Sequence, residues 1–110
     1  MKVGIIGAGM AGLACAQVLA ARKIAVSLFD KGRSPGGRMS SRRMATPLGE
    51  AVFDHGAQFI TAATPAFAAQ LRAGADAGVA APLPAAGAGS WVGVPAMNAV
   101  PKFMAIGCDI

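Results

Sequence analysis

The residues most suited to chemistry are three glycines near the N-terminus, within Gly7-Ala8-Gly9-Met10-Ala11-Gly12. A G-x-G-x-x-G spacing lets the backbone turn tightly and leaves free N–H groups at the start of a helix, where they bind phosphate. Gly7 would make the turn, Gly9 would let the backbone approach a pyrophosphate, and Gly12 would let the helix pack closely on the preceding strand. The hexapeptide therefore predicts a phosphate-binding turn.

The elements around this turn decide whether the pattern has meaning, because a chain with 15 glycines produces one by chance. The glycines follow a predicted strand, Lys2–Ile6, and open a predicted helix, Met10–Arg22. A second predicted strand, Ile24–Phe29, ends at Asp30, whose carboxylate is placed to accept hydrogen bonds from ribose hydroxyls. We expect both strands to be buried on both faces and to pair in parallel. The fold class is thus α/β, a Rossmann-like βαβ unit that binds a dinucleotide.

After Asp30 the sequence predicts shorter elements separated by loops. We expect a basic loop at Lys31–Arg43, a short strand at Ala51–Asp54, a helix from the N-cap Thr64 to about Arg72 that Gly74 stops, a low-complexity loop or linker at 78–90, and a last helix around Asn98–Ala105, with Pro101 in its first turn, that Gly107 stops.

Length and composition set the outer bounds. A chain of 110 residues forms one domain at most, and its 55% of hydrophobic residues excludes a charged disordered tail. The net charge of +5 is local, with Asp30 as the only acid in the basic stretch. A phosphate-bearing partner, either a nucleic acid or a dinucleotide, fits this charge. The basic residues of this stretch are Arg22, Lys23, Lys31, Arg33, Arg38, Arg42 and Arg43.

Cysteine and histidine usage indicates neither a disulfide framework nor a metal site. Cys15 and Cys108 are interpreted as two buried thiols in a reducing compartment, and one histidine, His55, cannot form a zinc set. The uncharged stretch from Val3 to Ala21 has the hydropathy of a signal peptide, but its glycines favour a strand, a turn and a helix. We therefore expect a cytoplasmic protein without a membrane span.

The segment after Asp30 resembles a known family. Asp30–Met39 contains a G-G-R run and is similar to the second signature of the flavin-containing amine-oxidase superfamily. Three further stretches, Ser40–Arg43, Phe53–Phe59 and Trp91–Met97, resemble the renalase-like branch of that superfamily. The resemblance covers residues 1 to about 75 closely and residues 91–110 well.

The resemblance implies an FAD-dependent oxidoreductase. In such enzymes a substrate passes a hydride to the flavin, and oxygen reoxidises the flavin to give hydrogen peroxide. Its partners would be oxygen and a small molecule, either a dihydronicotinamide dinucleotide or an amine, and no nucleic acid. The contacts that it implies for FAD are Gly7, Ala8, Gly9, Met10, Ala11 and Gly12 at the pyrophosphate, Asp30 and Lys31 at the ribose end, Gly36, Gly37 and Arg38 beside the pyrophosphate and flavin, and Gly56, Ala57 and Gln58 near the isoalloxazine ring.

Other residues are interpreted as structural. His55 beside Asp54 is expected to be a loop histidine, and Trp91 and Phe59 are expected to pack in the core. Ala96 stands where the family pattern usually has glycine, so its methyl would crowd whatever approaches that turn.

The family's chains are much longer than 110 residues. We therefore expect residues 1–110 to be the N-terminal part of an FAD/NAD(P)-binding Rossmann-like domain, incomplete, without its substrate domain and inactive alone.

Two other functions are compatible with the same residues. A nicotinamide-dependent reductase uses the same βαβ unit, although the G-G-R run argues against it. A small basic module that holds a nucleotide or nucleic acid without catalysis would explain the charge. The chain has no Tyr and no aromatic residues interleaved with its basic ones, so base stacking has little to work with.

Overall fold

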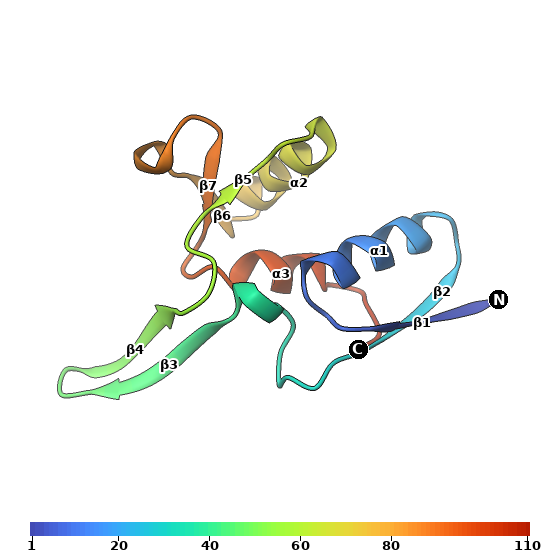
Figure 1. Ribbon diagram of the computed structural model, residues 1–110, viewed down its shortest axis with the longest axis horizontal. Coiled ribbons are helices and arrows are strands. Elements are labelled where there is room, and N and C mark those ends of the chain that lie inside the picture. Colours follow the sequence, from blue (N-terminus) through green and yellow to red (C-terminus); the bar gives the residue numbers. More distant parts are fainter.

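The computed structural model describes residues 1–110 and contains three α-helices and seven strands, with 3₁₀ turns at Gly37–Met39 and Pro84–Ala86. The elements are arranged in three small sheets rather than one large one (Figure 1). Their bounds are β1 Lys2–Ile6, α1 Met10–Ala21, β2 Ala25–Phe29, β3 Ser41–Thr46, β4 Gly49–Asp54, β5 Ile60–Thr61, α2 Pro65–Asp76, β6 Ala80–Pro82, β7 Ser90–Gly93 and α3 Ala99–Met104.

The predicted βαβ unit is confirmed. Strand β1 pairs in parallel with β2, from Lys2 opposite Ala25 to Ile6 opposite Phe29, and α1 is the crossover between them. The last residues of the chain lie against the other edge of β2, where the Leu28 N–H donates to the Asp109 carbonyl at 2.7 Å. Asp109 therefore occupies the place where a third parallel strand would pair with β2.

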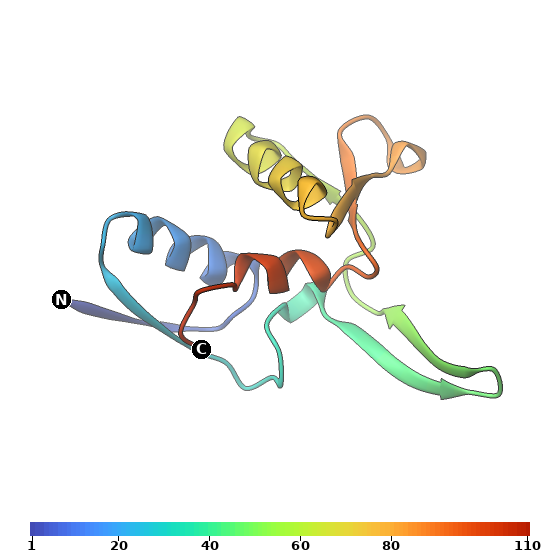
Figure 2. The same ribbon diagram turned by 180° about the vertical axis from the view of Figure 1, so that it is seen from behind.

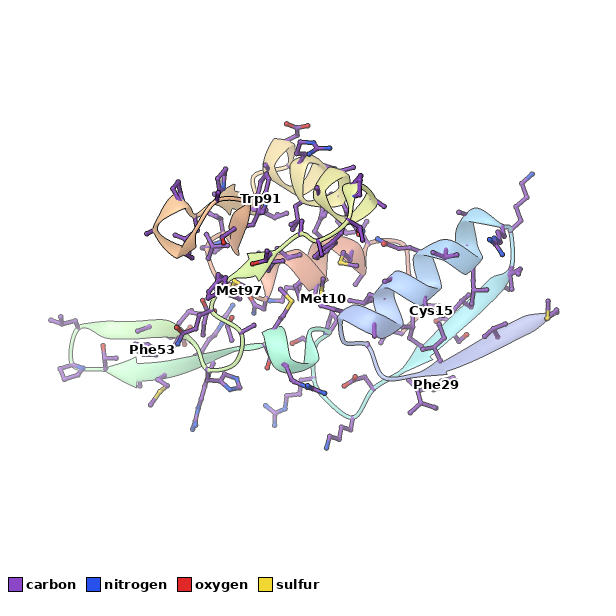
Figure 3. The ribbon with its side chains drawn as sticks, turned by 45° about the horizontal axis from the view of Figure 1, so that its top comes forward. Met10, Cys15, Phe29, Phe53, Trp91 and Met97 are labelled. Atoms are coloured by element: carbon purple, nitrogen blue, oxygen red, sulfur yellow. The ribbon has the colours of Figure 1, made fainter.

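Only one face of this sheet is covered. Helix α1 packs on this face, and α3 lies beside α1, as both views show (Figures 1 and 2). On the other face Ile6 is 88% exposed and Phe29 is 57% exposed, and Phe29 points away from α1 (Figure 3). The prediction that both strands are buried on both faces is therefore wrong for β1 and for the two ends of β2, because no layer packs on this second face.

Strands β3 and β4 form a hairpin that extends away from the other elements (Figure 1). This corrects the predicted loop at Lys31–Arg43, which ends in strand β3 from Ser41 onward. Arg42 is paired opposite Phe53 and Arg43 opposite Val52, and all four side chains are exposed. With neither face buried, β3 has no alternation of polar and apolar residues, so its sequence carried no strand signal.

The second layer consists of α2 and the sheet of order β5-β7-β6. Thr64 is the predicted N-cap, and its Oγ1 accepts a hydrogen bond from the Phe67 N–H at 3.2 Å. The helix is longer than predicted, because Gly74 lies buried within it and Gly78, at φ +80°, follows its end. The prediction of a loop or linker at 78–90 is wrong over β6, which packs on α2.

Helix α3 joins the two layers, and Pro101 is its third residue, as predicted. Gln17 of α1 donates to the Met104 carbonyl of α3 at 3.4 Å and accepts from Gln70 of α2 at 2.6 Å. One apolar core lies among these helices, and 19 of the 110 residues are buried. Its largest fully buried side chains are Leu13, Leu28, Leu71, Met97 and Pro101.

Three expectations about single side chains have mixed outcomes. Trp91 packs against the core, as predicted, whereas Phe59, just before β5, is 49% exposed, so its predicted place in the core is wrong. Cys15 is exposed on α1 and Cys108 is half-buried, so the prediction of two buried thiols is wrong.

The longest helices, α1 and α2, have 12 residues each, and no helix has the length and apolar character needed to cross a bilayer.

Candidate functional site

The glycine turn has the geometry that its glycines predict. Gly7 has φ +103°, a conformation that side chains disfavour, and its N–H donates to the Phe29 carbonyl of β2 at 2.7 Å. A Cβ atom on Gly12 would lie 2.0 Å from the Gly7 carbonyl oxygen. The turn can therefore pack this closely on α1 only because residue 12 has no side chain.

The start of α1 presents free donors beside open space. Gly9 is the N-cap, and the first helical bond runs from the Leu13 N–H to its carbonyl at 3.0 Å. The N–H groups of Met10, Ala11 and Gly12 have no acceptor within the chain, and the first turn carries no acid. A Cβ on Gly9 would meet only the Gly37 Cα, at 3.8 Å. This helix end can therefore accept an anion above Gly9.

Asp30 fastens the glycine turn to the end of β2. Its Oδ2 accepts from the Ala8 N–H at 2.7 Å, and its Oδ1 accepts from the Gly32 N–H, also at 2.7 Å. The bond from Ala8, and then that from Gly32, holds the pKa of the Asp30 carboxyl below its ordinary value. The carboxylate is exposed and keeps free lone pairs, so it can still accept from a ribose hydroxyl.

A second glycine pair returns to the turn. The Gly36 N–H donates to the Ala8 carbonyl at 2.9 Å, and Gly36 forms a parallel bridge with Gly9. Gly36 and Gly37 have φ of +140° and +54°, which bend the chain into the 3₁₀ turn at Gly37–Met39. The glycine turn at 7–12 and the segment at 36–39 thus lie next to each other, and both line one cleft.

The cleft between them has a volume of about 730 Å³. Most of the residues predicted to bind a cofactor line it, including the two cations Lys31 and Arg38. No acid lines it, so the predicted Asp30 lies outside the lining. Ile6 and Met39 also line the cleft and are not among the predicted residues. Ile6 directly precedes the predicted Gly7, and Met39 directly follows the predicted Arg38. The full lining is Ile6, Gly7, Gly9, Met10, Ala11, Gly12, Lys31, Gly36, Gly37, Arg38 and Met39.

Some predicted residues lie behind the cleft rather than in it. Ala8 is fully buried under the turn and contributes its backbone groups. The Ala57 N–H donates to the Arg38 carbonyl at 2.9 Å, and a Cβ on Gly56 would lie 2.0 Å from the same oxygen. Gly56 and Ala57 therefore support the 3₁₀ turn, and neither they nor Gln58 line the cleft. Their predicted contact with the isoalloxazine ring stays a prediction.

His55 is a loop residue beside Asp54. Its Nε2 lies 3.4 Å from the Ser40 Oγ, and its side chain is exposed outside the cleft. Asp54 is engaged elsewhere, because its Oδ1 accepts from the Ser41 hydroxyl at 2.7 Å and from the Met97 N–H at 3.0 Å. No three His, Cys, Asp or Glu side chains come together as metal ligands would.

The comparison with known proteins agrees with this geometry. Residues 5–73, more than half of the chain, match the NAD(P)-binding Rossmann-like domain family. Hydroxyneurosporene desaturase of Rubrivivax gelatinosus is 53% identical over 38 residues, which are 34% of this chain and 7% of the desaturase. The similarity thus spans a small part of that relative. The matched segment begins within β1 and contains the glycine turn, α1 and β2, so the chain belongs to the family of NAD(P)-binding Rossmann-like domains.

Proposed function

We propose that this chain binds FAD and forms the dinucleotide-binding part of a flavin-dependent oxidoreductase, of the renalase-like branch of the amine-oxidase superfamily. The observation that carries the proposal is the bridge between Gly9 and Gly36. It brings the G-G-R segment back over the first glycine turn, so that one cleft has glycine backbone on both sides. Such a cleft suits an extended dinucleotide, whose diphosphate needs close backbone approach.

The residues present fit a diphosphate group. Space above Gly9 is open, and a side chain at this position would fill it. The unpaired N–H groups of Met10, Ala11 and Gly12 and the positive end of α1 face that space. Lys31 and Arg38 add two positive charges to the same cleft. The chain would therefore hold the diphosphate with backbone donors and neutralise it with side chains.

Three roles follow for this chain's own residues. Asp30 holds the turn in shape through Ala8 and accepts from the ribose hydroxyls with its remaining lone pairs. Arg38 would lie beside the diphosphate and, as the family resemblance implies, the flavin. Gly56 and Ala57 hold the backbone of Arg38 in position. When bound, FAD supplies the ability to take a hydride from substrate and to pass the electrons to oxygen.

Similarity to a desaturase supports the oxidoreductase part of the proposal, because desaturation removes hydrogen from a substrate. The substrate proposed from the resemblance is a dihydronicotinamide dinucleotide or an amine, and the proposed location is the cytoplasm. A nicotinamide dinucleotide as the bound cofactor is the second candidate. It is favoured by the match to a family described as NAD(P)-binding.

The test is a direct comparison of FAD, NAD⁺ and NADP⁺ as ligands of the purified chain. Isothermal titration gives each dissociation constant, and the proposal expects FAD to bind at least about tenfold more tightly than either nicotinamide dinucleotide. Tighter binding of NAD⁺ or NADP⁺ would replace the flavin proposal with the second candidate.

A matched pair of arginine variants tests where the ligand lies. Arg38 lines the cleft, whereas Arg42, four residues later, is exposed on the β3–β4 hairpin outside it. Arg38→Gln should weaken FAD binding about tenfold, and Arg42→Gln should leave it within about twofold. Equal losses in the two variants would indicate nonspecific charge attraction instead of a defined site.

A further inference from the structure

A second hollow, separate from the glycine-turn cleft, gathers three cationic side chains from distant parts of the chain. Its volume is about 510 Å³, and it shares no lining residue with the cleft. Arg33 comes from the loop after β2, Arg43 from β3 and Lys102 from α3, and no Asp or Glu lines it. We propose that this basic hollow is a binding site for a phosphate-bearing small molecule, distinct from the dinucleotide cleft. Its lining is Arg33, Ser34, Ser41, Arg43, Val52, Pro95, Ala96, Asn98, Ala99 and Lys102.

Hydrogen bonds at the base of the hairpin bring Arg43 and Lys102 together. The Ser41 hydroxyl donates to Asp54 at 2.7 Å and accepts from the Asn98 N–H at 3.3 Å, which ties β3 to the start of α3. Arg43 lies two residues after Ser41, on the same face of its strand. Lys102 lies four residues after Asn98, on the same face of the helix. Both cationic residues therefore line one hollow beside this corner.

The third cation is held by packing of the loop after β2. Gly36 is buried, its N–H donates to the Ala8 carbonyl at 2.9 Å, and a Cβ at this residue would lie 3.4 Å from the Pro101 Cγ of α3. The loop thus lies against α3 next to Pro101, which precedes Lys102. Arg33 and Ser34, from this same loop, line the hollow together with Lys102.

The charges in and around the hollow favour an anion. Arg33 and Lys102 form no ion pair, and Arg43 is 3.6 Å from Glu50 in an exposed pair of the kind that is weak in water. Asp54 does not line the hollow, and its Oδ1 already accepts hydrogen bonds from the Ser41 hydroxyl and the Met97 N–H. The hollow thus keeps an excess of positive charge even with these two acids counted.

Phosphate matches this arrangement better than a lone carboxylate does. A phosphate monoester carries between one and two negative charges and three acceptor oxygens, whereas a carboxylate offers one charge. Two guanidinium groups present forked donors that fit phosphate oxygens, and Lys102 adds a point charge. Val52, Pro95 and the Ala96 methyl form an apolar wall for the organic part of the ligand. The volume is within the range of small-molecule sites.

The experiment titrates inorganic pyrophosphate into the full chain by calorimetry. The double variant Arg33→Gln/Lys102→Gln should weaken binding at the hollow about tenfold or more. The control Arg22→Gln/Arg72→Gln removes the same charge from the exposed surfaces of α1's end and α2, and it should change the dissociation constant by less than about twofold. Gly9→Val, which fills the dinucleotide cleft, should leave this site intact.

Amide chemical shifts identify the place of binding, because pyrophosphate in the hollow perturbs Ser34, Asn98 and Ala99. Three results would overturn the proposal. The first is an equal loss of affinity in the two double variants, which indicates nonspecific attraction to the net charge. The second is loss of all pyrophosphate binding in Gly9→Val, which assigns the anion to the cleft alone. The third is the absence of shifts at Ser34, Asn98 and Ala99.

Discussion

The Asp30 carboxylate accepts a hydrogen bond of 2.7 Å from the backbone N–H of Ala8, which lies 22 residues earlier in the chain. This contact joins the end of β2 to the middle of the glycine turn that follows β1. Its other oxygen accepts from Gly32 and so orders the start of the next loop. Asp30 therefore has a structural role in shaping the site, in addition to the proposed role of binding ribose.

Two variants of Asp30 separate these roles. Asp30→Asn keeps one side-chain acceptor for the turn but removes the charge, whereas Asp30→Ala removes both. We expect Asp30→Ala to weaken FAD binding by about tenfold or more, and Asp30→Asn to weaken it less. Flavin occupancy after gel filtration measures the effect. Turnover of any flavin-loaded protein should change less than occupancy, and unchanged occupancy in Asp30→Ala would remove this residue from the site.

Acid should destabilise the folded chain through the same carboxylate. Because its bonds from Ala8 and Gly32 lower the pKa of Asp30 in the folded state, the unfolded chain binds its proton at higher pH. The stabilisation is complete above the unfolded pKa of about 4 and is lost as pH falls through the lower folded pKa. The melting temperature of the wild type should therefore fall more steeply below about pH 4 than that of Asp30→Asn. Parallel curves would contradict this.

The two helical glycines give opposite predictions for the same substitution. Alanine favours a helix over glycine by about 1 kcal/mol. A Cβ at Gly12 meets the Gly7 carbonyl oxygen at 2.0 Å, whereas at Gly74 its nearest neighbours are Val79 Cγ2 at 3.4 Å and Ala80 Cβ at 3.5 Å. We expect Gly12→Ala to cost about 2–3 kcal/mol of unfolding free energy and Gly74→Ala to cost nothing or to stabilise. Denaturant unfolding of the two variants decides, and a Gly12→Ala variant as stable as wild type would refute the close packing.

Binding without turnover is expected for residues 1–110. Gly56 and Gln58 are exposed and do not line the cleft, so on this side water would reach the flavin end of a bound cofactor. An open site of this kind lacks the water-excluding surroundings that flavin chemistry requires. An assay of peroxide with dihydronicotinamide isomers and amines should find no substrate-dependent signal. Stoichiometric FAD with such a signal would show that the chain closes its own site.

The part of the fold that the sequence predicts well is the part determined by local constraints. The turn needs glycine at positions 7 and 12 for reasons of φ and contact distance, and Thr64 caps α2 through its own side chain. The elements that were missed depend on distant partners. Strand β3 exists because β4 pairs with it, and Gly74 continues α2 because β6 packs there. In the site, the family resemblance implies that both glycine segments lie near one pyrophosphate, but the backbone bridge between Gly9 and Gly36 depends on the folded chain and has no local sequence signal.

The central claim is that a dinucleotide lies over the glycine turn, and Gly9→Val tests it most directly. Gly9 has φ −78°, which valine adopts readily, and the only atom near its Cβ position is the Gly37 Cα at 3.8 Å. The variant should therefore fold, while its side chain occupies the diphosphate position. Ala14→Val, on an exposed part of α1 outside the cleft, is the matched control.

Titration of FAD into wild type, Gly9→Val and Ala14→Val is the measurement, with melting temperatures recorded for each. We predict at least about a 100-fold loss of affinity in Gly9→Val at a melting temperature close to that of wild type, and no loss in Ala14→Val. A folded Gly9→Val chain that binds FAD as tightly as wild type would contradict the placement of the dinucleotide over this turn.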